Sequence, residues 1–209
     1  MCAEELLPHR MTALGAIETN SVAHGFFLAD EAVKTADVRL VEATAVCAGK
    51  FLAIFDGSPV SVKSSLDSCR VQTSPGLFFR QLYLARVHPS VVPALVGDFP
   101  SVRGSLGLFE GYSALDSLRL ADEVAKRCSV SLLEIRLGRG LGGKSTLSFC
   151  GEQPSVEEAV EWIRDETWKE GLLSDVLVIP RPSQGAIRAS LPDGPGHACR
   201  GCTGDMREG

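Results

Sequence analysis

Cysteine is the residue type in this sequence best suited to chemistry, because its thiolate is both a nucleophile and a metal ligand. The seven cysteines are an odd number and show no spacing typical of a disulfide framework. In a reducing cytosol we expect most of them to be buried as small apolar side chains. They stand at positions 2, 47, 69, 128, 150, 199 and 202.

The end of the chain carries a pattern that resembles half of a zinc site. Cys199 and Cys202 are two residues apart, and His197 precedes them. A structural zinc takes four protein ligands, and only these three are local. We therefore interpret the pattern as fortuitous.

Two further patterns point toward enzymes but have simpler explanations. Residues 138–145 formally match the phosphate-binding loop, with Lys144 and Ser145 after the last glycine. The same stretch aligns with a turn in the first half of the chain that has no such loop, so we expect its glycines to serve a tight bend. Glu18 and Glu110 recur at one repeat position, yet no histidine or second carboxylate recurs with them. The sequence therefore predicts no enzyme.

The charge balance excludes some classes of partner. The formal net charge is -5 and the pI is near 5.4, whereas nucleic acids and anionic membranes require a concentrated basic surface. The longest apolar runs, such as 51–55, are too short to cross a bilayer. Residues 1–11 carry Glu4, Glu5 and His9 where a signal peptide would be apolar. We expect a cytosolic protein with neither a nucleic-acid nor a membrane partner.

An internal repeat is the strongest signal in the chain. Residues 13–42 align with residues 105–134 at a constant offset of 92, with twelve identities in thirty positions. Chance would give roughly two. After a two-residue insertion the match resumes and pairs Phe55 with Phe149, and near its end it pairs Leu84 with Leu177. Repeats of this kind are typical of a domain that occurs twice.

Hydrophobic periodicity predicts the same elements in each copy. A short strand that contains Glu18 is followed by a helix over 22–36, whose apolar residues recur at spacings of three and four. Strands are expected over 38–45 and 51–55, and a second helix is expected to begin near Ser61, or Ser155 in the second copy. The last strands are expected over 81–87 and 175–179.

Each copy is thus β-α-β-β-α-β, a ferredoxin-like plan with helices on one face of the sheet. The predicted fold class is α+β, with two tandem domains. Residues 1–11 are expected to be an N-terminal extension, 12–100 the first domain, 101–187 the second domain and 188–209 a flexible C-terminal tail.

Several blocks in the right order resemble the shell domain of bacterial microcompartments (BMC). They are residues 13–18, 29–34, 38–42 and the turn before Phe51, and their recurrence resembles the tandem-domain class of these proteins. Within that class, the blocks at 17–23, 47–51, 87–93 and 178–182 are most similar to the propanediol-utilisation branch. The resemblance covers residues 12 to about 186. It implies a homotrimer that forms a pseudohexameric tile in the shell of a microcompartment.

The resemblance also implies a central pore lined by the turn between the second and third strands of each copy. The pore-lining residues would be Ala48, Gly49, Gly140, Leu141, Gly142 and Gly143. In the propanediol-utilisation branch a cysteine that matches Cys47 lies on the three-fold axis and binds a [4Fe-4S] cluster. Three chains would each supply one thiolate to one cluster per trimer. Such a cluster would pass electrons across the shell or plug the pore.

Further residues are implied at the edges of the tile. Lys34 and Lys126 occupy the same repeat position, and the matching lysine of the family contacts the adjacent tile. Arg86, His88 and Arg181 are expected to support that contact. The implied partners are other BMC shell proteins at the edges, with encapsulated redox enzymes as further partners.

Three hypotheses remain at this point. The first is a shell tile with an iron-sulfur cluster on Cys47, and the second is a metal-free tile with an open pore for small metabolites. The third, from another class, is a phosphate-loop enzyme that uses Lys144.

Overall fold

The computed structural model describes residues 13–98, 100–138, 140–168 and 173–191. The N-terminal extension and the pattern formed by His197, Cys199 and Cys202 lie outside these residues. No helix in the described part is long and apolar enough to cross a membrane.

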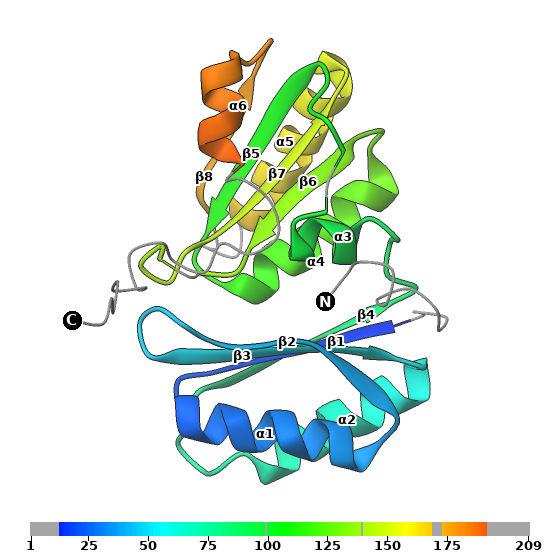
Figure 1. Ribbon diagram of the computed structural model, residues 1–209, viewed down its shortest axis with the longest axis vertical. Helices are drawn as coiled ribbons and strands as arrows, with labels where there is room; N and C mark the ends of the chain where they lie inside the picture. Colours follow the sequence, from blue (N-terminus) through cyan, green and yellow to red (C-terminus); the bar gives the residue numbers. More distant parts are fainter. Residues whose placement is uncertain (1–12, 99, 139, 169–172, 192–209) are drawn as a thin grey trace, which may run out of the picture.

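The chain folds into two four-stranded antiparallel sheets with the same topology (Figure 1). The strand order is β2-β3-β1-β4 in the first sheet and β6-β7-β5-β8 in the second. Both halves follow the β-α-β-β-α-β plan, so the predicted α+β fold with two ferredoxin-like domains is confirmed. The elements are β1 (Ala13–Thr19), α1 (Val22–Thr35), β2 (Val38–Val46), β3 (Lys50–Gly57), α2 (Pro59–Gln72), β4 (Phe79–Ala85), α3 (Val91–Val96), β5 (Ser105–Gly111), α4 (Ala114–Arg127), β6 (Ser131–Arg136), β7 (Ser145–Gly151), α5 (Gln153–Trp168), β8 (Leu173–Ile179) and α6 (Gln184–Ser190).

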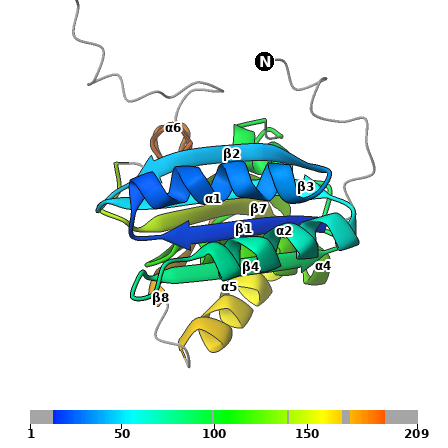
Figure 2. The same ribbon diagram turned by 90° about the horizontal axis from the view of Figure 1, so that it is seen from below.

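Helices α1 and α2 cover one face of the first sheet (Figure 2). Their contact with the sheet depends on small residues in the strands and helices. A Cβ atom added at Gly15 would lie 2.6 Å from the Phe55 ring, and one at its repeat equivalent Gly107 would lie 2.3 Å from the Phe149 ring. The repeated glycines therefore leave room for the repeated phenylalanines.

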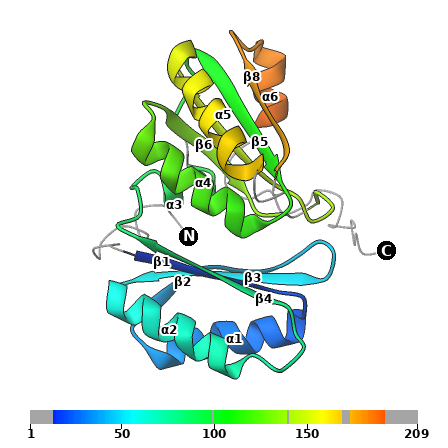
Figure 3. The same cartoon turned by 180° about the vertical axis from the view of Figure 1, so that it is seen from behind.

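The other face of the first sheet packs against the second domain. Leu14, Leu52 and Leu84 on that face join Leu115 and Leu118 of α4 in one continuous core. Helix α3 lies at the same junction and contacts β6 and α4. The second sheet has α4 and α5 on one side and α6 on the other (Figure 3). The neighbour that the open face of the first sheet requires is thus supplied from within the chain.

The second helix of each copy starts earlier than the sequence predicts. Helix α2 begins at Pro59, where its fixed φ suits the first turn, and Ser58 is the N-cap. The Ser58 Oγ accepts a hydrogen bond from the Ser61 backbone N–H at 3.1 Å. Helix α5 begins at Gln153, so Ser155 lies within its first turn. Both helices therefore begin two residues before the predicted positions, Ser61 and Ser155.

The last strands also differ from the predicted alignment. Leu14 lies opposite Leu84, and its equivalent Leu106 lies opposite Ile179. Leu84 therefore corresponds to Ile179 and not to Leu177, an offset of 95 in this part of the repeat. Leu173 lies opposite Gly111 but Asp175 lies opposite Glu110, so Ser174 is an extra residue in β8 that shifts the alignment by one. Helix α6 continues past residue 187, the expected end of the second domain.

Candidate functional site

The two turns expected at the pore are adjacent in the structure. Cys47 lies in the tight turn between β2 and β3, and the glycine-rich turn at 137–144 joins β6 to β7. A Cβ atom added at Gly143 would lie 3.1 Å from the Cys47 carbonyl oxygen, and one at Gly138 would lie 3.7 Å from Val46. Turns from separate domains therefore meet on one side of the molecule, at the left in Figure 1.

The backbone of these turns explains their glycines. Gly49 has φ of 75°, and Gly140, Gly142 and Gly143 have φ of 70°, 62° and 88°. Side chains rarely adopt such angles, so glycine is the residue that fits. Ala48 and Gly49 are exposed beside Cys47, and Leu141 is half-buried in the other turn.

Cys47 is the accessible thiol among the described cysteines. Its side chain is exposed, whereas Cys69, Cys128 and Cys150 are buried. Burial raises the pKa of Cys69 to about 12 and also raises the pKa of Cys128. The expectation of buried apolar thiols is confirmed for these three residues. A thiolate at neutral pH is thus disfavoured at Cys69 and Cys128.

A metal site built from the described residues would have to draw on more than one chain. Among the described residues, no three His, Cys, Asp or Glu side chains gather closely enough to hold a metal ion. Cys47 is one exposed thiol on the turn between β2 and β3. Iron-sulfur clusters require several thiolates, which this turn supplies only when copies of it meet.

The phosphate-loop pattern does not have the architecture that its chemistry requires. Such a loop leads into a helix whose N-terminus holds the phosphate, but strand β7 begins at Ser145. The Ser145 hydroxyl is buried and donates to the Ser113 carbonyl oxygen at 2.6 Å. Lys144 forms an ion pair with Glu110 at 2.5 Å. Lys144 and Ser145 are thus engaged in contacts of the second sheet, and the match to the phosphate-loop pattern is one of sequence alone.

The repeated glutamates are structural in both domains. The buried Glu18 carboxylate accepts hydrogen bonds from Lys50 Nζ and Ser113 Oγ, each at 2.9 Å. The equivalent Glu110 pairs with Lys144, and this hydrogen bond is the main cause that lowers the pKa of Glu110. Each glutamate thus ties the middle of its sheet to the residue that follows the pore turn.

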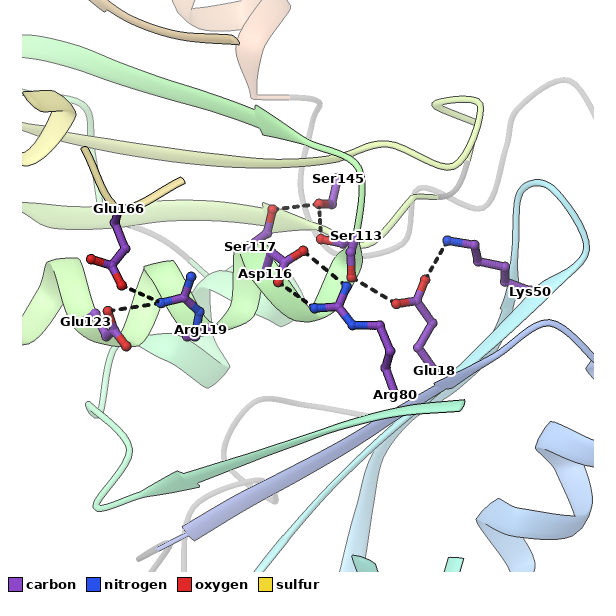
Figure 4. A network of polar contacts seen from close by, with 10 residues as sticks. All are labelled: Glu18, Lys50, Arg80, Ser113, Asp116, Ser117, Arg119, Glu123, Ser145 and Glu166. Carbon is purple, nitrogen blue, oxygen red and sulfur yellow. Dashed lines mark hydrogen bonds and ion pairs between the residues drawn. The ribbon is translucent and has the colours of Figure 1, made fainter. Parts of the chain in front are cut away.

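A polar network connects the two domains (Figure 4). The Arg80 guanidinium donates to both carboxylate oxygens of Asp116, at 2.9 and 3.3 Å. Ser113 links Glu18 to the first turn of α4. Sequence reasoning missed Arg80 and Asp116, because the residues at their repeat positions are of different types. We call this contact between the first sheet and α4 the internal joint.

Two of the expected edge residues, Lys126 and His88, lie at the internal joint. Lys126 Nζ donates to the Ala85 carbonyl oxygen at 3.3 Å and to Asp122 at 2.5 Å. Asp122 also accepts a hydrogen bond from the His88 backbone N–H at 2.7 Å. Lys34, at the equivalent position of α1, is exposed and pairs with Asp30. The hydrogen bond to Asp30 raises the pKa of Lys34.

The two remaining edge residues share an unusual backbone conformation. Arg86 and Arg181 follow the last strand of each domain, are exposed, and have φ of 48° and 49°. These are the positive φ values among non-glycine residues of the described chain. Residues other than glycine adopt such angles at a cost, and the cost is often retained at functional positions.

Comparisons with known proteins agree with this repeat structure. The family model described as "BMC domain" matches twice, at residues 13–87 and 105–182. The bacterial microcompartment shell protein PduT of Citrobacter freundii is 29% identical over 177 residues, which cover 84% of this chain and 96% of that protein.

Solved structures give the same result. A microcompartment protein of Desulfitobacterium hafniense superposes with a TM-score of 0.79 at 35% identity and covers 85% of this chain and 99% of its own. The fused permuted hexameric shell protein MSM0275 shares the fold, with a TM-score of 0.55 at 17% identity over 76% of this chain and 82% of its own.

Proposed function

The chain belongs to the BMC-domain family of bacterial microcompartment shell proteins, and from this premise we propose that three copies close into a pseudohexameric tile with a central pore. The shell of a microcompartment is then where the protein acts. The proposal rests most on one observation, that the Cys47 turn and the Gly143 turn of the same chain lie next to each other on one side of the molecule. In a trimer, each chain would contribute these two adjacent turns, and six turns together would line the pore.

The internal joint supports the closed ring. It shows how one BMC domain of this chain docks on the next, with a helix laid on the open face of a sheet. One such helix, α1, and one such face, on the second sheet, remain at the two ends of the chain. Repetition of the same contact between copies generates a ring, and a ring whose rotation closes has cyclic symmetry.

We propose further that the pore binds one [4Fe-4S] cluster through Cys47 of each of the three copies. The exposure of Cys47 and its place in the pore turn support this assignment. Three chains would supply three thiolates, and the second pore turn, with Leu141 in place of a cysteine, would supply none. A bound cluster supplies one-electron redox chemistry. The tile would then transfer electrons across the shell, with encapsulated redox enzymes as partners, or carry a plugged pore.

Anaerobic purification tests the cluster. We expect the wild-type trimer to be brown, to contain iron and acid-labile sulfide, and to lose both when Cys47→Ser is introduced. Ala48→Ser, in the same exposed turn, is the matched control and should keep the colour. A colourless trimer with intact wild-type Cys47 would refute the cluster and leave the tile in place. A wild-type monomer at every workable concentration would refute the tile.

The alternative function is a metal-free tile whose open pore conducts small polar metabolites. The glycine-rich turn favours it, because Gly140 and Gly142 leave open space around their α-carbons and expose backbone amides. Cryo-electron microscopy of the trimer separates the two proposals. Density for a cluster on the three-fold axis supports the first, and an empty lumen supports the second.

A further inference from the structure

We propose that copies of this chain join through a second version of the internal joint in which the charges are reversed. His24 of α1 would meet Asp175 of β8 in the next copy, where the internal joint has Asp116 of α4 and Arg80 of β4. The inference rests on the proposed tile and names the residues that select its partner surface. The partner is a second copy of this chain, docked head to tail.

The register of the two sheets makes the positions equivalent. Arg80 lies directly opposite Glu18 in the first sheet, and Asp175 lies directly opposite Glu110 in the second. On the helices, Ser21 and Ser113 are the N-caps of α1 and α4, and His24 and Asp116 each come three residues later. Both partners of the Arg80–Asp116 ion pair therefore have a counterpart at the opposite ends of the chain.

Exposure identifies which surface of α1 lacks its neighbour. Phe26 of α1 is 59% exposed, whereas Leu118 at the equivalent position of α4 is 0% exposed at the internal joint. The side chain of Asp30 is 54% exposed, whereas that of Asp122 is 4% exposed. Helix α1 thus presents the same face that α4 buries, and that face carries a large apolar residue.

The second sheet offers a receiving face of the same shape. Its open face has a hollow of about 220 Å³. Leu108, Glu110, Thr146, Ser148, Asp175 and Leu177 line the hollow, together with Phe109 and Arg136. In the first domain the corresponding face is filled by α4. Helix α6 flanks this face, as α3 flanks the internal joint.

Charge decides which helix fits which face. Glu110 and Asp175 lie opposite one another, and like charges at such positions repel. Lys144 pairs with Glu110, and Arg136 pairs with Glu134. The Asp175 carboxylate accepts a hydrogen bond from the Val176 backbone N–H at 2.8 Å. A further donor or positive charge on the docking helix would offset its negative charge.

His24 can supply that donor. Its Nε2 accepts a hydrogen bond from the Ser74 backbone N–H at 3.4 Å, which puts the ring proton of the neutral form on Nδ1. The Nδ1–H can then donate to the Asp175 carboxylate of the next copy. Docking of α4 at this face would instead bring Asp116 to two carboxylates, and docking of α1 on the first sheet would bring His24 to Arg80. Each face therefore selects one helix, and first and second domains alternate around the ring.

A charge-swap cycle tests the pair. His24→Asp and Asp175→Arg are made singly and together, and the trimer fraction is measured by native mass spectrometry across a dilution series. His24→Asp brings two carboxylates together, and like charges at an interface repel. Asp175→Arg removes the acceptor and leaves two hydrogen-bond donors facing each other. Each single variant should therefore raise the midpoint concentration of assembly by roughly tenfold or more. The double variant recreates the charges of the internal joint between copies, and its midpoint should return to within about threefold of wild type.

Controls separate this result from a folding defect and from failure of the tile. Asp67→Arg changes the same charge on the exposed surface of α2 and should leave assembly unchanged. Circular dichroism checks that each variant is folded, and His24→Glu with Asp175→Lys repeats the cycle with other side chains. A trimeric wild type whose single variants assemble normally, or whose double variant is not restored, would overturn the pairing while the tile stands. A monomeric wild type would overturn both.

Discussion

Asp116 lies in the first turn of α4 and faces Arg80 of the first domain. Its side chain is 5% exposed, whereas that of Arg80 is 37% exposed, so the pair is buried mainly on the carboxylate side. A buried charged group that keeps its partner is tolerated, and loss of the partner leaves a desolvated charge. The contact between the domains therefore depends strongly on this one residue.

We predict that Asp116→Asn lowers the free energy of unfolding by about 1–3 kcal/mol, because the amide cannot accept the bidentate contact from Arg80. Urea denaturation at fixed protein concentration measures the change. Asp67→Asn is the matched control, since Asp67 pairs with Arg70 on the exposed surface and should contribute less than about 1 kcal/mol. Equal losses in the two variants would contradict the role of the internal joint.

From the sequence, the importance of a repeat position could be predicted only where the two copies carry the same residue. Lys34 and Lys126, or Glu18 and Glu110, stand out because each pair is identical. Arg80 and Asp116 do not, because their equivalents are Asp175 and His24. The residues that distinguish one joint from the other are therefore the ones that a search for identity passes over.

Strand β5 and the turn at 137–144 are held together by the Glu110–Lys144 ion pair. The hydrogen bond from Lys144 lowers the pKa of Glu110, and the same bond raises the pKa of Lys144. Both side chains are more than a third exposed, so solvent screens the pair. The pair nevertheless joins the residue that ends the glycine-rich turn to strand β5.

The sign of the pH dependence follows from the lowered pKa. A carboxyl with a lower pKa in the folded state stabilises the fold above its unfolded pKa of about 4.3, and the gain is lost as the pH falls through the folded pKa. We therefore predict that Glu110→Gln is less stable than wild type at pH 6 and equally stable once Glu110 is protonated in both states. Thermal unfolding between pH 2.5 and pH 7 measures this, and a constant difference across that range would contradict it.

The order of the elements could be predicted from periodicity, and their ends could not. Helix α2 begins at Pro59 because Ser58 caps it, and the apolar pattern alone does not distinguish this start from one at Ser61. The alignment of the last strand failed because the register of β8 shifts by one residue between Glu110 and Gly111, and hydrophobic periodicity does not predict such a shift. Periodicity reports which face of an element is apolar, whereas the internal joint depends on what that face meets.

At the scale of the whole molecule, the expected edge of the tile includes Arg86 and Arg181. Each follows the last strand of a domain and keeps a backbone angle that glycine would adopt more readily. Retention of arginine at both positions is consistent with selection for the side chain. The role of these residues in contacts with other shell proteins remains a prediction.

We predict that the double variant Arg86→Gly and Arg181→Gly folds and assembles into trimers as wild type does, because glycine suits both angles. Its stability should change by no more than about 1 kcal/mol. Electron microscopy should show that sheets of tiles are lost, since the arginine side chains are gone from the edge. Normal sheets from the double variant would remove Arg86 and Arg181 from the edge contact.

The difference between the Cys47 turn and the Gly140–Gly143 turn has an evolutionary consequence. In a ring built from one repeated domain, any mutation in the turn appears at all six positions at once. Duplication within one gene lets half of the positions diverge while the others keep their original residues. In the ring that we propose, a thiol can then be introduced at every second position, while the turns between keep glycine and leucine in its place.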